Sequence, residues 1–357
     1  MTFRHAILAG SVLTAALAIG IAIMSYAQLP RAEITLRGSG ASFPYPIYTE
    51  WFRSFSDKEN DIFVDYDMTS SEEGIRDFIG GTVDFAGSDA AMDYSEIVRV
   101  KRGVVLLPVT AGEVALVFNI PGLTALKLPR DAYVDIFSGK ITNWNDPRIA
   151  GANPGSELPD LKITVVTRSD ASGTTFILTG HLARISEEFS EAIGQGRTTS
   201  WPTTANFRKA PGNQGVAALV KRTPGAIGYV EYGFAKLVEL TVAQLQNRAG
   251  NFVSPGTEGG AAALADVEFR DRALPGSNAP DLVAWPWDPE TENAYPITSF
   301  TWLLLYADQE DDKAAALRQL LSYMLSDEAQ SQAPDQGFVP LPQSVRDKVR
   351  AATAFIR

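Results

Sequence analysis

The chain has 357 residues, 45% hydrophobic and 20% charged, so it can bury a large core and is long enough for two domains. Its formal net charge of −11 argues against a nucleic acid partner. The same charge repels phosphate or sulfate at long range, so an anion site here has to use local, buried donors. Cysteine is absent, which excludes a disulfide framework and a lipid-modified N-terminal cysteine.

The N-terminus has the pattern of a secretory signal peptide. Arg4 and His5 precede an uncharged run, 6–24, and Ser25 and Ala27 supply the small residues of a cleavage site after Ala27. An exported protein that is not a lipoprotein follows. The alternative is an uncleaved membrane anchor, because the apolar run is nearly long enough to span a bilayer.

The next segments predict strand-loop-helix units. A glycine-rich approach leads into a first helix, for which Ser42 is the expected N-cap and Pro44 lies in the first turn. A strand over 62–66 precedes Ser70, which has capping-box spacing to Glu73 at the start of a second helix.

A third short strand ends in a turn of small residues that carries Asp89, for which a solvated turn aspartate is the plain alternative. Residues 103–119 follow and are rich in Val and Leu. This succession indicates an α/β sheet with crossover helices.

Residues 163–174 predict a buried strand, a polar turn and a helix start. The turn places hydroxyls and free backbone N–H groups at the positive end of a helix, which suits a small oxyanion: Ser172, Gly173 and Thr174. Arg168 adds a fork of donors that Asp170 can hold in place. A capped helix with a surface Arg–Asp pair is the alternative.

The rest of the chain alternates in the same way. We expect helices over 131–137, from the anion turn to about residue 193, over 215–221 and over 312–326, and strands over 226–230 and 295–306; residues 247–278 are loop-like with one helical piece.

Taken together, these segments resemble the periplasmic phosphate-binding proteins of ABC-type phosphate importers. The resemblance covers 38–351 and rests on Gly40-Ala41-Ser42-Phe43-Pro44, Thr82-Val83-Asp84-Phe85 with Ser88-Asp89, Asn119-Ile120-Pro121-Gly122, Arg168 to Thr174, Gly225 to Tyr232 and Pro296-Ile297-Thr298. It implies an α/β, two-lobed type II periplasmic binding protein fold with phosphate in the cleft. We expect 1–27 to be the signal peptide, 28–111 with 297–357 to form lobe 1, and 112–296 to form lobe 2.

The resemblance also implies a set of phosphate-binding residues. Position by position these are Ser42, the backbone N–H of Phe43, Ser71 or its neighbour Ser70, Asp89 as acceptor of the phosphate proton, Arg168 with its partner Asp170, and Ser172, Gly173 and Thr174. The chain departs from the family at Glu72-Glu73, where glycines are common. We expect Glu73 to turn back to the helix start and Glu72 to face solvent.

The function implied is high-affinity phosphate binding and delivery to the membrane permease of an ABC importer. No cofactor and no catalysis are implied, and a monomer is expected. Alternatives are a protein for another oxyanion, a phosphate sensor, or an exported phosphate-ester hydrolase. The hydrolase would need a metal cluster or an activated nucleophile, yet the chain has two histidines and no Gly-x-Ser-x-Gly motif. We expect His181 to be a packed or surface residue.

Overall fold

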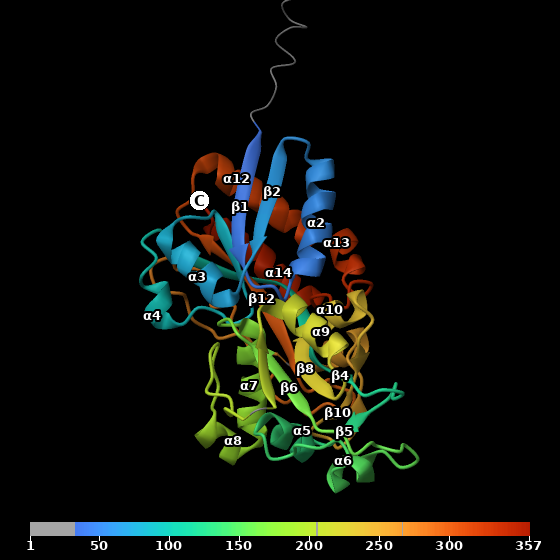
Figure 1. Cartoon of the computed structure of the whole chain (residues 1–357). Helices are drawn as coiled ribbons and strands as arrows, with labels where there is room; N and C mark the ends of the chain where they lie inside the picture. The colour runs from blue at the N-terminus through green and yellow to red at the C-terminus, as the bar shows by residue number, and fades with distance from the viewer. Residues whose placement is uncertain (1–32, 205, 266) are drawn as a thin grey trace, which may run out of the picture.

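The computed structural model describes residues 33–204, 206–265 and 267–357 (Figure 1). The expected signal peptide lies outside these residues. Within the described part of the chain, no helix combines the length and the apolar character needed to cross a membrane.

The main sheet runs through both halves of the molecule. Its strand order is β2 (Ile62–Met68), β1 (Ile34–Gly40), β3 (Phe85–Ser88), β12 (Thr298–Tyr306), β4 (Val104–Asn119), β8 (Ala226–Glu231), β6 (Thr164–Arg168) and β7 (Phe207–Ala210), and β9 (Thr241–Val242) pairs with β4. β1 is parallel to β2 and β3, and β6 is parallel to β7 and β8. Each half therefore has the parallel, helix-covered character that the strand-loop-helix pattern predicts.

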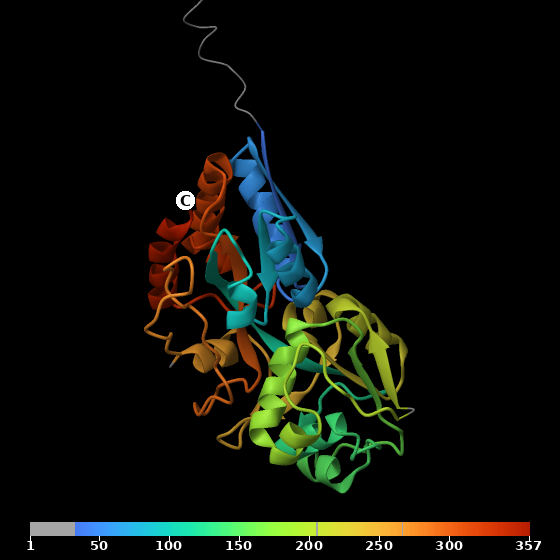
Figure 2. The same ribbon diagram turned by 90° about the vertical axis from the view of Figure 1, so that its left-hand side faces the viewer.

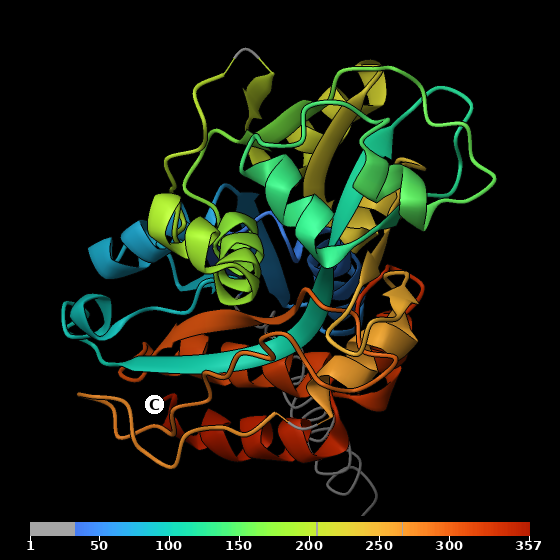
Figure 3. The same cartoon turned by 90° about the horizontal axis from the view of Figure 1, so that it is seen from below.

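One long strand joins the two halves. In β4, residues up to Glu113 pair with β12, and residues from Val114 onward pair with β8. All of β4 except Asn119 is buried, which agrees with its many Val, Leu and Ala residues. Figure 3 shows β4 as a curved strand that runs beside β12 and then passes into the other half.

Helices cover both halves of the sheet (Figures 1 and 2). The half that contains β1 carries α2 (Tyr45–Lys58), α3 (Ser71–Gly80), α4 (Tyr94–Ile97), α12 (Asp311–Met324), α13 (Asp327–Gln332), α14 (Gln343–Ala352) and a 3-10 turn, Thr353–Phe355. The half that contains β6 carries α5 (Arg130–Phe137), α6 (Pro147–Ala152), α7 (Gly173–Ile185), α8 (Glu187–Ala192), α9 (Gly212–Arg222) and α10 (Tyr232–Leu237).

The segment before β12, residues 267–297, contacts both halves. It follows α11 (Thr257–Leu264) and a small sheet of β5 (Lys127–Leu128), β10 (Gln244–Gln246) and β11 (Phe252–Val253). The indole N–H of Trp302 donates to the carbonyl of Leu282 at 2.8 Å, and Arg130 pairs with Asp288 at 2.7 Å. This segment therefore packs on β12 of one half and on α5 of the other.

The structure confirms the α/β, two-lobed architecture and corrects three local expectations. The helix expected to continue to residue 193 is two helices, because Ser186 ends α7 and its hydroxyl accepts from the N–H of Phe189 to cap α8. Ser326 caps α13 in the same way, so the helix expected over 312–326 ends at Met324. Ser42 is not a helix cap: α2 begins at Tyr45 after Pro44, because the carbonyl of Ser42 closes a turn onto the Tyr45 N–H.

Candidate anion-binding site

The expected site residues lie where the two halves meet. In one half, the parallel strands β1 and β2 end in the loops that precede α2 and α3, and β3 ends in the loop that carries Asp89. In the other half, β6 and β7 end in the loops that precede α7 and α9. Ligands of open α/β sheets bind at the carboxyl ends of such strands, where helix N-termini also point their free N–H groups. The topology therefore brings together segments that are far apart in sequence.

Asp89 is buried at this meeting point, with 1% of its surface exposed. Its Oδ1 accepts a hydrogen bond from the hydroxyl of Thr301 on β12 at 2.8 Å, and its Oδ2 lies 3.5 Å from the Ser71 hydroxyl. Burial raises the pKa of Asp89 to about 7, although Thr301, the charge of Arg168 and Ser71 each lower it. The alternative, a solvated turn aspartate, is therefore wrong.

Ser71 connects the two halves directly. Its hydroxyl oxygen accepts from the N–H of Asp89 at 3.3 Å and from the N–H of Gly173, in the other half, at 3.1 Å. A Cβ on Gly173 would lie 2.4 Å from the Ser71 hydroxyl and 2.7 Å from Asp89 Oδ2, so a side chain at this position would clash with both. Glycine is therefore required for this close approach.

Arg168 is held by a carboxylate on one side. Its Nε donates to Asp170 Oδ1 at 2.8 Å, its Nη2 pairs with Oδ2, and its Nη1 reaches the Thr174 hydroxyl at 3.4 Å. Burial alone would raise the pKa of Asp170, but the hydrogen bond and charge of Arg168 and the N–H of Gly212 bring it below its ordinary value. Because the Arg168 side chain is only 2% exposed, the surface-pair alternative is wrong.

Ser42 and Thr174 meet through Asn213, which lies at the start of α9. The Asn213 side-chain amide donates to the Ser42 hydroxyl at 2.9 Å and to the Thr174 hydroxyl at 3.3 Å, and its Oδ1 accepts from the Glu231 N–H. Asn213 is fully buried. This contact is a second connection between the halves.

The remaining predicted residues line the same region in different roles. Ser70 is the N-cap of α3, because its hydroxyl accepts from the N–H of Glu73 at 3.2 Å, whereas the Ser71 hydroxyl contacts the other half. Ser172 caps α7 by accepting from the Thr175 N–H at 3.2 Å. The N–H of Phe43 has no hydrogen-bond partner within the described residues, while its ring is buried.

Of the two glutamates after Ser71, Glu72 is exposed as expected, whereas Glu73 does not turn back to the helix start. The carboxylate of Glu73 lies 3.9 Å from Arg76, one turn along α3, instead of returning to the helix start. Glu72 is half exposed but is not free, because Arg197 approaches it at 2.9 Å from the other half.

Three residues of the site were not predicted from the sequence: Asn213, Thr301 and Tyr229. The turn Pro211-Gly212-Asn213 before a helix is a usable signal for Asn213. Tyr229, whose hydroxyl accepts from the Arg168 N–H at 3.1 Å, and Thr301 lie inside buried strands, and nothing local marks them.

His181 is packed, as expected. It is buried on α7 and its Nε2 lies 3.0 Å from the Tyr133 hydroxyl. Burial lowers the pKa of His181 to about 3, so the imidazole is neutral at physiological pH.

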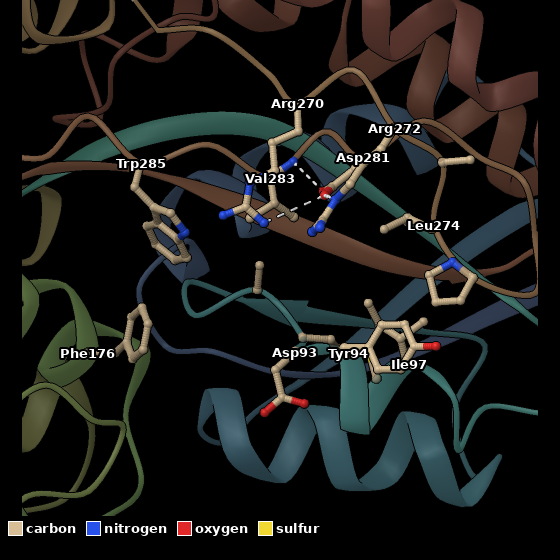
Figure 4. Close-up of a pocket in the computed structure, with 14 residues that line it drawn as sticks. Asp93, Tyr94, Ile97, Phe176, Arg270, Arg272, Leu274, Asp281, Val283 and Trp285 are labelled. Atoms are coloured by element: carbon tan, nitrogen blue, oxygen red, sulfur yellow. Dashed lines mark hydrogen bonds and ion pairs between the residues drawn. The ribbon is translucent and has the colours of Figure 1, made fainter.

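A separate pocket of about 480 Å³ lies between α4, Phe176 of α7 and the segment before β12 (Figure 4). Arg270 and Arg272 enter it, and both lie within ion-pair distance of the buried Asp281 carboxylate. Trp285 and Tyr94 also line it. It contains none of the residues described above, so it is not the anion site.

The site thus combines one buried guanidinium, hydroxyls and helix N-terminal N–H groups with one buried carboxylate. Donors from both halves suit the oxygens of a small tetrahedral oxyanion, and the carboxylate can accept a hydrogen bond from an anion that carries a proton. Two α/β lobes joined by crossing strands, with such groups between them, define the two-lobed class of solute-binding protein.

Comparisons with known proteins agree with this class. The family model described as "PBP superfamily domain" matches residues 26–328. The phosphate-binding protein PstS of Pasteurella multocida is 37% identical, over 94% of this chain and 94% of that protein. The PstS of Xylella fastidiosa is 34% identical, over 90% of this chain and 86% of that protein. The chain belongs to the PstS family of phosphate-binding proteins.

A solved structure supports the same fold. A high-affinity periplasmic phosphate-binding protein, crystallised with phosphate, superposes with a TM-score of 0.73 at 24% sequence identity, covering 89% of this chain and 93% of that one. At this level of identity the similarity establishes the two-lobed fold.

Proposed function

We propose that this chain binds inorganic phosphate between its lobes and delivers it to the membrane permease of an ABC-type importer. The proposal rests on the presence, in one site, of a buried carboxylate, Asp89, and a buried guanidinium, Arg168, among hydroxyl and N–H donors. Hydrogen phosphate has both acceptors for the donors and a proton for the carboxylate. Sulfate near neutral pH has no proton to give, so it offers no hydrogen bond to Asp89 Oδ2, whereas Oδ1 already accepts from Thr301.

In this proposal each residue has one role. Arg168 supplies charge-assisted hydrogen bonds, and Asp170 orients it. The hydroxyls of Ser42, Ser71 and Thr174 and the N–H groups of Phe43 and Gly173 supply further donors; Ser172 supports the loop as the cap of α7 and Ser70 as the cap of α3. Asp89 accepts the phosphate proton.

The same proposal includes closure of the lobes. We assign 28–111 with 297–357 to one lobe and 112–296 to the other, which is supported by the change of pairing partner in β4 between Glu113 and Val114. Ser71 and Asp89 lie before this crossing and Arg168 after it, so neither lobe holds a complete site. Phosphate therefore stabilises the closed form through contacts that exist only when both lobes meet.

We further propose that the protein is periplasmic, cleaved after Ala27, monomeric and without catalytic activity. The relatives named PstS and the N-terminal sequence pattern support this proposal.

Calorimetry of the mature protein tests the proposal. We expect one phosphate per chain, much weaker sulfate binding, and no release of phosphate from a phosphate monoester. Small-angle scattering should show a more compact particle at saturating phosphate. A chain that gives no phosphate heat, or that turns over the monoester, would contradict the proposed function.

A further inference from the structure

Arg197 lies beside the anion site, but its side chain contacts none of the proposed ligand groups. It belongs to the loop after α8. Its carbonyl accepts from the N–H of Ser172 at 2.8 Å, so its backbone is bonded to the loop between β6 and α7. Its guanidinium points to the other half. The side chain is 19% exposed.

Two carboxylates of the opposite half receive this guanidinium. Nε of Arg197 lies 2.9 Å from Glu72 Oε2 at the start of α3, and its Nη2 pairs with Glu96 Oε1 on α4. The Glu96 carboxylate is itself fixed, because its Oε2 accepts from the Asp93 N–H at 2.9 Å in the capping box of α4. A positioned carboxylate loses little side-chain entropy when it pairs, which favours a net contribution.

These ion pairs exist only while the halves are in contact. Arg197 is attached to one half, whereas Glu72 and Glu96 belong to elements of the other. Glu72 directly follows Ser71, whose hydroxyl makes the contact with Gly173, and the Glu72 N–H itself donates across the cleft to the Ala171 carbonyl at 3.4 Å. Opening the cleft would separate the cation from both carboxylates and leave two negative charges beside the helix that binds the anion.

We infer that Arg197 is a latch between the lobes, a positioning residue that stabilises the closed form and slows release of the bound anion. The inference rests on the proposed function for its ligand, inorganic phosphate. It also accounts for Glu72 beside an anion site: in the closed form Arg197 neutralises that carboxylate, so the glutamate stabilises closure instead of repelling the ligand.

The test is a comparison of phosphate binding by the mature wild type and Arg197→Gln, measured by calorimetry and by stopped-flow dissociation. We expect the dissociation constant to rise about threefold to tenfold, as for two partly exposed ion pairs, mainly through faster dissociation. Raising the NaCl concentration should accelerate dissociation more in the wild type than in Arg197→Gln. Arg148→Gln is the matched control, because the partners of Arg148, Asp135 and Asp146, lie in its own half.

A second background separates a latch from direct attraction of phosphate by the Arg197 charge. In a Glu72→Gln, Glu96→Gln protein, Arg197→Gln should cause no further loss if it acts through the carboxylates. Three results would overturn the latch. The first is an equal loss of phosphate affinity in this background, and the second is an unchanged dissociation constant in Arg197→Gln alone. The third is the same loss of affinity in Arg148→Gln. Arg197→Lys, which keeps the charge, should give an intermediate loss, and it replaces Arg197→Gln in the same comparison if the glutamine variant does not fold.

The wild-type measurement keeps the two proposals apart. If the wild type gives no phosphate heat, the proposed function fails. If the wild type binds phosphate and the Arg197 variants bind it equally well, the latch alone fails.

Discussion

The hydroxyl of Thr301 donates a hydrogen bond to Oδ1 of Asp89 at 2.8 Å, which joins β12 to the loop after β3 at the centre of the site. This bond occupies one carboxylate oxygen and leaves Oδ2 directed toward Ser71 and Gly173. Thr301 also lowers the pKa of Asp89, which burial raises. Thr301 therefore both positions the Asp89 carboxylate, which we propose accepts the phosphate proton, and lowers its pKa.

Removing this hydroxyl should weaken phosphate binding in a pH-dependent way. In Thr301→Val the pKa of Asp89 should rise further, so more of the carboxyl is protonated at pH 7 and cannot accept from the ligand. We expect a loss of about 0.5–1.5 kcal/mol at neutral pH that shrinks at higher pH. The measurement is phosphate affinity between pH 6.5 and 9, with Thr298→Val as control, since the Thr298 hydroxyl bonds the Tyr295 carbonyl instead. A loss that does not depend on pH would argue against this role.

Arg168→Ala should weaken phosphate and sulfate together. Arg168 supplies donors that either anion can use, and charge-assisted hydrogen bonds contribute about 1.5–3 kcal/mol each. The ratio of the two affinities should therefore change little while both fall steeply. Titration with each anion checks this, and Arg168→Lys, which keeps the charge without the fork, should lose less. Selective loss of one anion would contradict the assignment.

Asn213→Ala tests the second connection between the lobes. Loss of its amide removes donors to Ser42 and Thr174, and we expect phosphate affinity to fall by about 1–2 kcal/mol. Asn213→Asp should be worse, because it replaces the donor by an acceptor and adds a negative charge next to the anion. Calorimetry of both variants provides the measurement; Asn143→Ala, at a surface amide paired with Asp160, serves as control. If Asn213→Ala binds phosphate with wild-type affinity, Asn213 does not contribute to phosphate binding.

Buried carboxyl groups should make the ligand-free protein less stable as the pH rises. Burial raises the pKa of Asp89 to about 7 and raises the pKa values of Glu113 and Glu231 well above their ordinary range. Between the ordinary carboxyl pKa, about 4, and the raised value, the folded chain holds protons that the unfolded chain releases, so the free energy of unfolding falls with rising pH.

The titration of Asp89 alone lowers the free energy of unfolding by at most on the order of 4 kcal/mol between pH 4 and 7. Urea unfolding in phosphate-free buffer at pH 5 and pH 8 measures the decrease, and Asp89→Asn should show a smaller one. An equally steep decrease in Asp89→Asn would show that this carboxyl does not titrate in the predicted window.

The site residues that the sequence predicted share a recognisable position. Asp89 and Arg168 each stand at or just after the end of a short apolar strand, β3 and β6. Ser71 begins the helix after β2, and Gly173 begins the helix after β6. Such strand-loop-helix junctions are local, so composition and order alone identify them. The resemblance to phosphate-binding proteins then indicated that phosphate binds at these junctions.

Residues that depend on long-range contact were missed or assigned wrongly. In the sequence, Thr301 is one more residue of an apolar strand. It lies beside Asp89 only because of the register of β12 against β3 and β4. Ser42 has the chemistry of a helix cap, but its hydroxyl is used by Asn213, which is 171 positions away in sequence. Glu72 is exposed as expected, but its partner, Arg197, comes from the other lobe and was not predicted from the sequence.

The most direct test of the central claim is competition between phosphate and sulfate in the wild type and in Asp89→Asn, at fixed pH and salt. Asparagine keeps the size of the side chain, but its amide can donate as well as accept, and it removes one negative charge from the cleft. We predict that selectivity shifts toward sulfate by about 1–3 kcal/mol, while absolute phosphate affinity changes less, because lost repulsion offsets the lost hydrogen bond. An unchanged phosphate-to-sulfate ratio would contradict the claim that Asp89 accepts the phosphate proton.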